Sequence, residues 1–193
     1  EADIYRFDRD VSDTVKGNEK DFNAYMFIKR SIDRLSQDAK DIEAASAGES
    51  VPKLNRRSVS DYTINELQPT LTALEQKLGP EKLADFEKAS NEYQRYMDDA
   101  LRLQVESGRM SKEVYDAIKE GNQFYAPFKV MKYLEENSRP QGSGKRIDTV
   151  ADYTKAMKGI EDADFKLGDM LGAARQGILM SRILADKNTA MRH

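Results

Sequence analysis

The chain has 193 residues, of which 39% are hydrophobic and 34% charged, and its formal net charge is −3 at pH 7. A chain of this length can bury the core of one helical domain. The high proportion of charged residues favours long helices with one buried stripe, and therefore an elongated shape over a spherical one. With no Cys and a single His at its end, the sequence excludes disulfides, thiolate metal sites, cysteine nucleophiles and histidine-based catalytic pairs. The small net charge gives no argument for nucleic acid or an anionic membrane as a partner of the whole surface.

No secretory signal or membrane span is predicted, because the most apolar stretch, residues 170–185, is interrupted by two arginines and a glutamine. We therefore expect a soluble chain. It begins at Glu1 instead of Met and stops at His193 within a pattern that is still helical, so we interpret it as a fragment of a larger protein.

Residues 18–47 carry the clearest helical pattern, with apolar residues recurring mostly at spacings of three and four. Gly48 is placed to end this helix, and residues 48–60 have the Gly, Pro and polar composition of a connecting loop. The apolar stripe consists of Phe22, Tyr25, Met26, Ile28, Ile32, Leu35, Ala39 and Ile42.

A second helix is predicted from Thr63 to residue 78. Thr63 and Glu66 have the spacing of a capping box, in which each side chain bonds the backbone N–H of the other residue. Pro69 is expected to kink this helix or to mark a restart within it, because proline cannot donate the backbone hydrogen bond that a helix interior needs.

Gly79 followed by Pro80 predicts a helix stop and then a first-turn proline, which opens a long helix to about Ser107. This helix and the first one have about 28 residues each, or roughly 42 Å at 1.5 Å per residue. We expect the two to pack as an antiparallel pair joined by the 63–78 hairpin, forming a spine over residues 18–107.

The motif segment, residues 108–134, begins with a predicted short helix that ends near Glu120 and continues with three aromatics around one proline. Because Pro127 pushes the preceding residue toward an extended conformation, we interpret this part as an extended aromatic clasp. Residues 135–148 contain Pro, Gly and Ser and are predicted to form a mobile loop, followed by a C-terminal helical region over 149–193.

These elements predict a single all-α domain over residues 1–193. Its expected architecture is an elongated helical bundle with two long antiparallel helices, a short extended aromatic-proline segment and a C-terminal helix. No internal repeat divides the chain.

Two stretches have part of the pattern of a ligand-binding loop, and each lacks a required residue. Residues 141–145 have the end of a phosphate-binding loop, but Arg139 and Arg146 stand where the first glycine and the hydroxyl belong. Residues 8–19 have the acidic spacing of a calcium loop, but Asp13 stands where the sharp turn needs glycine. We therefore expect no cofactor and no metal.

Aromatic and small residues near the end of the chain are the candidates for contact with another protein. Phe124, Tyr125 and Phe128 are predicted to lie in the core, since exposed aromatic clusters are rare without a partner, with a contact surface as the alternative. The glycines of the last helix either allow a second helix to approach closely or simply loosen their own helix. The interaction candidates are Phe124, Tyr125, Pro127, Phe128, Lys129, Gly168, Gly172 and Gly177.

Residues 107–128, SGRMSKEVYDAIKEGNQFYAPF, carry a resemblance to a known family. The run resembles the pattern S-G-x-hydrophobic-S-x-E-x-Y, then Y-x-P-F, of large polyvalent-protein-associated domains of tailed phages and mobile elements. Residues 22–30 are similar to the aromatic and basic helix that precedes this motif, and residues 182–188 to the helix that follows it. Lys129 stands where the family commonly has Arg, so a bidentate anion contact is not implied there.

The resemblance implies a module of an internal virion or ejection protein, which is packaged in the virion interior and delivered with the genome into the host cell. Such proteins often join helical modules of this kind to enzymatic domains, and no activity is implied for the module itself. From the residues and the resemblance we expect a non-catalytic structural and interaction module. Its partners would be other segments of the parent protein, other virion proteins or a second copy of the chain.

Two alternatives stay open. A DNA-associated module, which protects or accompanies incoming DNA, would bind phosphates through basic side chains with an affinity that falls steeply with salt. A carboxylate-based peptidoglycan-cleaving enzyme would use two carboxylates, such as Glu87 with Glu92 or Glu113 with Glu120, although no spacing selects them over the other acidic residues. The nucleic-acid candidates are Lys53, Arg56, Arg57, Lys145, Arg146, Arg175, Arg182 and Lys187.

Overall fold

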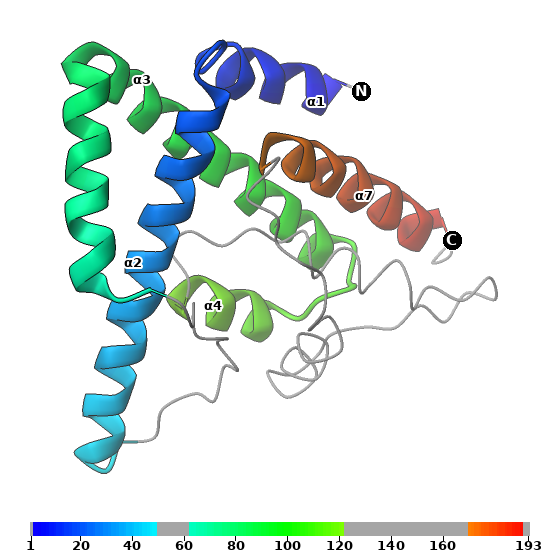
Figure 1. The fold of residues 1–193 in the computed structure, drawn as a ribbon. Helices are drawn as coiled ribbons and strands as arrows, with labels where there is room; N and C mark the ends of the chain where they lie inside the picture. Colours follow the sequence, from blue (N-terminus) through cyan, green and yellow to red (C-terminus); the bar gives the residue numbers. More distant parts are fainter. Residues whose placement is uncertain (1, 50–61, 122–169, 191–193) are drawn as a thin grey trace.

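The computed structural model describes residues 2–49, 62–121 and 170–190. Within these ranges nearly every residue is helical and no strand occurs, which confirms the all-α fold class. Five α-helices and one π-helical turn follow each other along the described chain (Figure 1). They are α1 (Ala2–Phe7), η1 (Asp8–Ser12), α2 (Glu19–Ser46), α3 (Ile64–Glu106), α4 (Lys112–Gly121) and α7 (Met170–Ala190).

α2 occupies the first predicted helix almost residue for residue and ends where the sequence predicts. Gly48 takes a positive φ of 82°, which glycine adopts without the strain that a side chain brings. The Gly48 N–H donates to Ala45 O at 3.1 Å, and the Glu49 N–H donates to Ala44 O at 3.0 Å. These are the two hydrogen bonds of a Schellman motif, so the end of α2 is set by local sequence.

α3 starts at the predicted capping box and turns sharply in its middle. At its start the Thr63 N–H donates to Glu66 Oε2 at 2.8 Å. Gly79, with φ 74° and ψ 170°, leaves helical geometry, and the helix starts again at the next residue. We name residues 64–78 the first arm of α3 and residues 80–106 its second arm.

The break in α3 lies at Gly79, whereas the sequence analysis also expected a kink or restart at Pro69. Pro69 stays within the first arm, and the non-helical backbone angles are those of Gly79. Pro69, the sixth residue of the helix, removes one backbone hydrogen bond, whereas glycine reaches backbone angles that other residues avoid. The chain therefore turns at the glycine.

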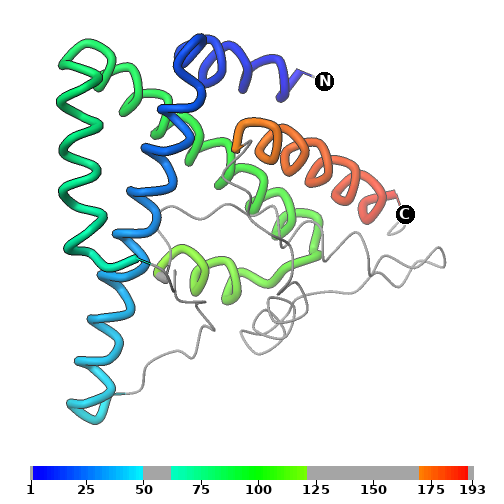
Figure 2. The backbone as a smooth tube through the Cα atoms, in the orientation of Figure 1, coloured from blue at the N-terminus to red at the C-terminus, as the bar shows by residue number. Residues whose placement is uncertain are grey.

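The predicted spine of two long antiparallel helices is not confirmed, because Gly79 redirects the chain. The first arm runs antiparallel along α2, and the second arm crosses the start of α2 and continues toward α7 (Figures 1 and 2). Before the corner, Lys77 Nζ lies 2.9 Å from Asp21 Oδ2. After it, Lys82 Nζ donates to Asn18 Oδ1 at 3.2 Å. The beginning of α2 thus holds both arms at the corner.

The core joins both ends of the described chain. Phe7 of α1 packs edge-to-face against Tyr96, with ring centroids 5.5 Å apart, and Phe22 of α2 packs against Phe86 at 5.3 Å. Aromatic pairs in this geometry add to the free energy gained by burial. α7 closes the core with Met170, Leu171, Ala174 and Ile178.

The remaining predictions have mixed outcomes. The short helix that opens the motif segment is confirmed as α4, and the end of the C-terminal helical region is confirmed as α7. The aromatic-proline segment and the predicted loop over 135–148 lie outside the described residues. Residues 2–12 form α1 and η1, which the sequence analysis did not predict as helix.

Candidate functional site

α7 lies against the second arm of α3 through a face of small residues. Ser181 Oγ donates to Ala100 O at 2.8 Å, and Gln104 Nε2 donates to Ser181 O and Oγ at 2.9 and 3.0 Å. Because both side chains are buried, these hydrogen bonds remove the cost of leaving the Ser181 hydroxyl and the Gln104 Nε2 unpaired away from water, whereas Gln104 Oε1 is buried without a hydrogen-bond partner among the described residues. The small buried residues of this face are Ala174, Gly177, Ser181 and Ala185.

An arginine ties α7 to η1. Arg175 Nε donates to Asp8 Oδ1 at 2.6 Å, and Arg175 Nη2 donates to Ser12 Oγ at 2.9 Å. Ser12 Oγ in turn donates to Asp8 Oδ1 at 3.0 Å, which completes a three-membered network. The stretch with the spacing of a calcium loop thus begins with η1 and continues as a turn, and its first carboxylate, Asp8, binds an arginine.

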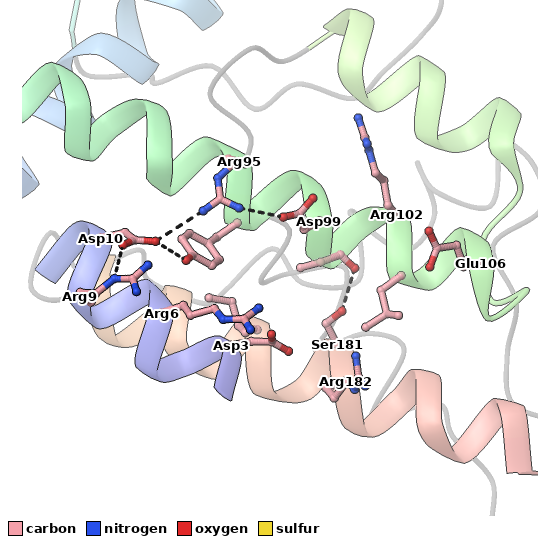
Figure 3. Close-up of a pocket in the computed structure, with 14 residues that line it drawn as sticks. Asp3, Arg6, Arg9, Asp10, Arg95, Asp99, Arg102, Glu106, Ser181 and Arg182 are labelled. Atoms are coloured by element: carbon pink, nitrogen blue, oxygen red, sulfur yellow. Dashed lines mark hydrogen bonds and ion pairs between the residues drawn. The ribbon is translucent and has the colours of Figure 1, made fainter. Parts of the chain in front are cut away.

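Between these contacts, α1, η1, the second arm of α3 and α7 enclose a pocket of about 450 Å³ (Figure 3). This volume lies in the range of small-molecule sites. Its apolar part consists of Ala100, Leu103 and Ile178. The polar residues that line it are Asp3, Arg6, Arg9, Asp10, Arg95, Tyr96, Asp99, Arg102, Glu106, Ser181 and Arg182.

Asp10 binds three of its neighbours in this pocket. It accepts hydrogen bonds from Arg9 Nε and from the Tyr96 hydroxyl, both at 2.7 Å, and Arg95 Nη2 lies 3.7 Å away. These donors favour the carboxylate, so the hydrogen bonds from Arg9 and Tyr96 lower the pKa of Asp10 to about 2. Asp10 is therefore a fixed negative charge at neutral pH and a poor proton donor there.

Arg95 lies over the ring of Tyr96, with its guanidinium carbon 4.3 Å from the ring centroid. The same guanidinium pairs with Glu92 at 2.7 Å and with Asp99 at 3.5 Å. Burial, and then the hydrogen bond to Asp10, raise the pKa of Tyr96, so its hydroxyl remains a hydrogen-bond donor. The charges at this end of the pocket neutralise each other.

Arg102 points away from the pocket toward α4 (Figure 3). Its Nε lies 2.9 Å from Asp98 Oδ2, and Asp98 also binds Lys119 Nζ at 2.9 Å and the Tyr115 hydroxyl at 2.8 Å. Burial raises the pKa of Asp98, but its hydrogen bonds with Lys119 and Tyr115 outweigh this and lower the pKa overall. This cluster fastens α4 to the second arm of α3.

Four charged side chains of the pocket are left out of these pairs. Asp3, Arg6 and Glu106 form no ion pair with another described residue, and Arg182 has a distant one with Asp186 at 3.6 Å. Figure 3 shows Asp3 and Arg6 on α1, with Glu106 and Arg182 toward the other end of the pocket. Among the described residues, Asp3, Arg6 and Glu106 therefore have no ion-pair partner, and the one partner of Arg182 lies outside the pocket.

The described part of the motif, residues 107–121, is a turn followed by α4. Met110, Val114 and Ile118 are almost completely buried, and Asn188 of α7 donates a hydrogen bond to Ser107 O. These contacts place the start of the motif between the second arm of α3 and the end of α7. The motif therefore stabilises the fold in this region.

The geometry does not assemble an acid/base pair from the glutamates considered in the sequence analysis. Glu92 pairs with Arg95, Glu113 lies in the first turn of α4, and neither lines the pocket. Within the described residues, no group of three or more His, Asp or Glu side chains is arranged to hold a metal ion.

The structure places three of the predicted nucleic-acid residues, all on α7. Arg175 binds Asp8, Arg182 lines the pocket, and Lys187 is exposed in the last turn. Of the interaction candidates, Gly177 is buried and Gly172 is half-buried. The candidates outside the described residues are Lys53, Arg56, Arg57, Lys145, Arg146, Phe124, Tyr125, Pro127, Phe128, Lys129 and Gly168.

The pocket was not predicted from the sequence because its walls come from distant parts of the chain. Asp10 and Tyr96, which bind each other, are 86 residues apart. The available signal was the run of charges in α1 and η1, where Asp3, Arg6 and Arg9 recur every third residue and so share a helix face. Such a run is also typical of a solvated face.

Comparisons of the chain with protein-family models, with curated proteins and with solved structures found no match. Among the helices that the structure describes, none has both the length and the apolar character needed to cross a membrane.

Proposed function

We propose that this chain is a non-catalytic helical interaction module that associates through the outer part of α2, residues 35–42. The phage setting of the proposal, a virion-packaged protein delivered with the genome, is supported by the sequence resemblance of residues 107–128. The non-catalytic part is supported by the pocket, where Asp10 and Asp99 are held in ion pairs. The interaction part is supported by an apolar stripe that continues beyond the core.

The apolar stripe of α2 has the spacing of a coiled coil, alternating between three and four residues. Burial decreases along it, from the fully buried Tyr25, through the half-buried Leu35, to Ile42, which is 68% exposed. Figure 2 shows the reason, because α2 extends past the start of the first arm of α3. The residues of the stripe are Tyr25, Ile28, Ile32, Leu35, Ala39 and Ile42.

A helix end with this pattern is stabilised by a second helix. Most helix stability in proteins comes from packing of the apolar face, and an isolated helix in water is marginal. A second copy of the chain offers the same stripe, and two such stripes pack antiparallel around a twofold axis. We therefore expect a homo-oligomer that forms with increasing concentration through Leu35, Ala39 and Ile42.

Light scattering after size exclusion, across a concentration series, tests this proposal. The wild-type chain should gain mass with concentration, and Ile42→Lys should stay monomeric because a charge would enter the apolar seam. Ala44→Lys is the matched control, since residue 44 lies on the opposite face of the same turn and a lysine near a helix end is favourable. A wild-type chain that stays monomeric, or an Ile42→Lys variant that still associates, would overturn the proposal.

The same experiment with a short DNA duplex separates the alternative. A monomer that gains mass only with DNA, and loses it as salt rises, would favour the DNA-associated module. Association that is indifferent to DNA supports the interaction module.

A further inference from the structure

Three polar contacts hold α7 at successive positions along its length. Near its start, Arg175 binds a carboxylate of η1. In its middle, Ser181 shares buried hydrogen bonds with Gln104, and near its end Asn188 donates to a backbone carbonyl at the end of α3. The second arm of α3 and α7 lie side by side and run in the same direction (Figure 1). Each contact therefore fixes where α7 lies along the second arm.

The packing of α7 does not by itself define this position. Small buried residues recur every four positions along the helix, at Gly177, Ser181 and Ala185. Residues four apart lie on the same face of a helix, so a slip of one turn, roughly 6 Å at 1.5 Å per residue, puts Gly177 in the place of Ser181. The same slip puts Met180 in the place of the buried Leu184. Small and apolar places thus stay small and apolar.

The slip is possible in one direction only. In the opposite direction it would put Arg182 in the place of Ile178, which is 7% exposed, and so bury a charge. In the permitted direction the one poor fit is Met170 in the place of Ala174, where the neighbours must accommodate a larger but flexible side chain. Packing therefore allows two positions of α7.

The three polar contacts distinguish these two positions. In the slipped position an apolar residue or a glycine takes the place of each polar residue, so all three contacts are lost together. The replacements are Leu171 for Arg175, Gly177 for Ser181 and Leu184 for Asn188.

The cost of burying Gln104 indicates that the middle contact serves position more than stability. Its side chain is fully buried, and its Oε1 has no hydrogen-bond partner among the described residues. A leucine there would leave no polar atom unpaired, because the Ser181 hydroxyl would still donate to Ala100 O. In coiled coils a single buried polar residue fixes the register at such a cost in stability.

We propose that the three polar contacts, with Gln104 at their centre, lock α7 in one of two positions that its packing allows, one helical turn apart. Gln104 is then a positioning residue. Shifts of one turn between packed elements are a known form of conformational switch. The lock lies within one chain and does not involve the outer part of α2, so its outcome is independent of the self-association proposed above.

The distance between two spin labels on one chain tests the proposal. The chain has no cysteine, so Lys88→Cys on α3 and Thr189→Cys on α7 provide exposed attachment sites. The slip lengthens this distance by up to roughly 6 Å, which pulsed electron paramagnetic resonance resolves. We expect one distance without further changes, and a second, longer one when Gln104→Leu, Asp8→Ala and Asn188→Ala are combined. Dilution with unlabelled chain restricts the measurement to distances within one chain.

Two further variants separate position from strength. Ile178→Val removes a buried methylene group and leaves the three contacts intact, so it should lower the urea midpoint and keep a single distance. Gln104→Leu alone should unfold at the same urea concentration as wild type or at a higher one. The proposal is wrong if the triple variant keeps a single distance or no longer folds. It is equally wrong if Ile178→Val gives a second distance or if Gln104→Leu lowers the urea midpoint.

Discussion

Arg175 and Asp8 are 167 residues apart in sequence, and the Arg175 Nε donates to Asp8 Oδ1 at 2.6 Å. This ion pair joins the last described helix to the turn that follows the first one. It has no counterpart in local sequence pattern, so it reports on the tertiary fold alone.

Removing this ion pair should loosen the contact between α7 and η1. Both side chains are 38% exposed, so water screens the pair, and we expect Asp8→Ala to lower the free energy of unfolding by about 1 kcal/mol or less at low salt. Urea unfolding at low and high salt measures the effect, which should shrink as salt rises. Asp186→Asn, in an exposed pair on α7, is the control and should have a smaller effect.

The low pKa of Asp10 predicts a loss of stability in acid. Its ordinary pKa is 3.8, and the fold lowers it to about 2, so the folded state binds this proton less readily than the unfolded state. The stabilisation is present above pH 3.8 and is lost as the pH falls toward 2. Urea unfolding across this interval should give a steeper pH dependence for wild type than for Asp10→Asn. Equal slopes would show that Asp10 is not held by Arg9 and Tyr96 in solution.

Every replacement of Gly79 should destabilise the fold. Its φ of 74° and ψ of 170° lie in a region that glycine alone occupies readily, so both Gly79→Ala and Gly79→Asn should destabilise by about 1–3 kcal/mol. Nothing lies within 4 Å of a Cβ added there, so the cost comes from the backbone. Gly48 is the comparison, since asparagine is tolerated better than alanine at a helix C′ position. If Gly79→Asn and Gly48→Asn cost equally little, the corner of α3 differs in solution.

The buried hydrogen bonds of Ser181 should contribute to the packing of α7. Ser181→Ala removes the donor to Ala100 O and one acceptor of Gln104 Nε2, and we expect a loss of about 1–2 kcal/mol. Thr189→Ala, an exposed change on the same helix, should be nearly neutral. Chemical unfolding with far-ultraviolet circular dichroism measures both variants.

Local signals in the sequence predicted the end of α2 and the start of α3. Thr63 with Glu66 and the glycine at position 48 act within one helical turn, and the structure contains both caps where expected. Gly79 was likewise predicted as a helix boundary. The predicted direction of the chain after Gly79 was wrong, because this direction depends on the contacts of Lys77 and Lys82 with the start of α2.

The pocket was beyond the reach of sequence patterns for the same reason. The charges of α1 and η1 have the pattern of any solvated helix face, and only the tertiary contact between Asp10 and Tyr96 shows that they line a pocket. The apolar stripe of α2 shows a second limit of sequence patterns. Its regular period continues from Tyr25 to Ile42, although Tyr25 is buried and Ile42 is exposed. Periodicity identifies a face and leaves open what covers it.

The position of α7 also bears on how the chain is made by the ribosome. Leu171, Ala174 and Ile178 belong to the same core as Phe7 and Val11, so α1 and η1 cannot complete their packing before α7 has been synthesised. During synthesis α2 and the first arm of α3 can pack against each other early. Phe7 of α1 is only partly packed until α7 has left the ribosome. We expect the completed core to form only after translation has passed residue 190, with α1 open to chaperones and proteases until then.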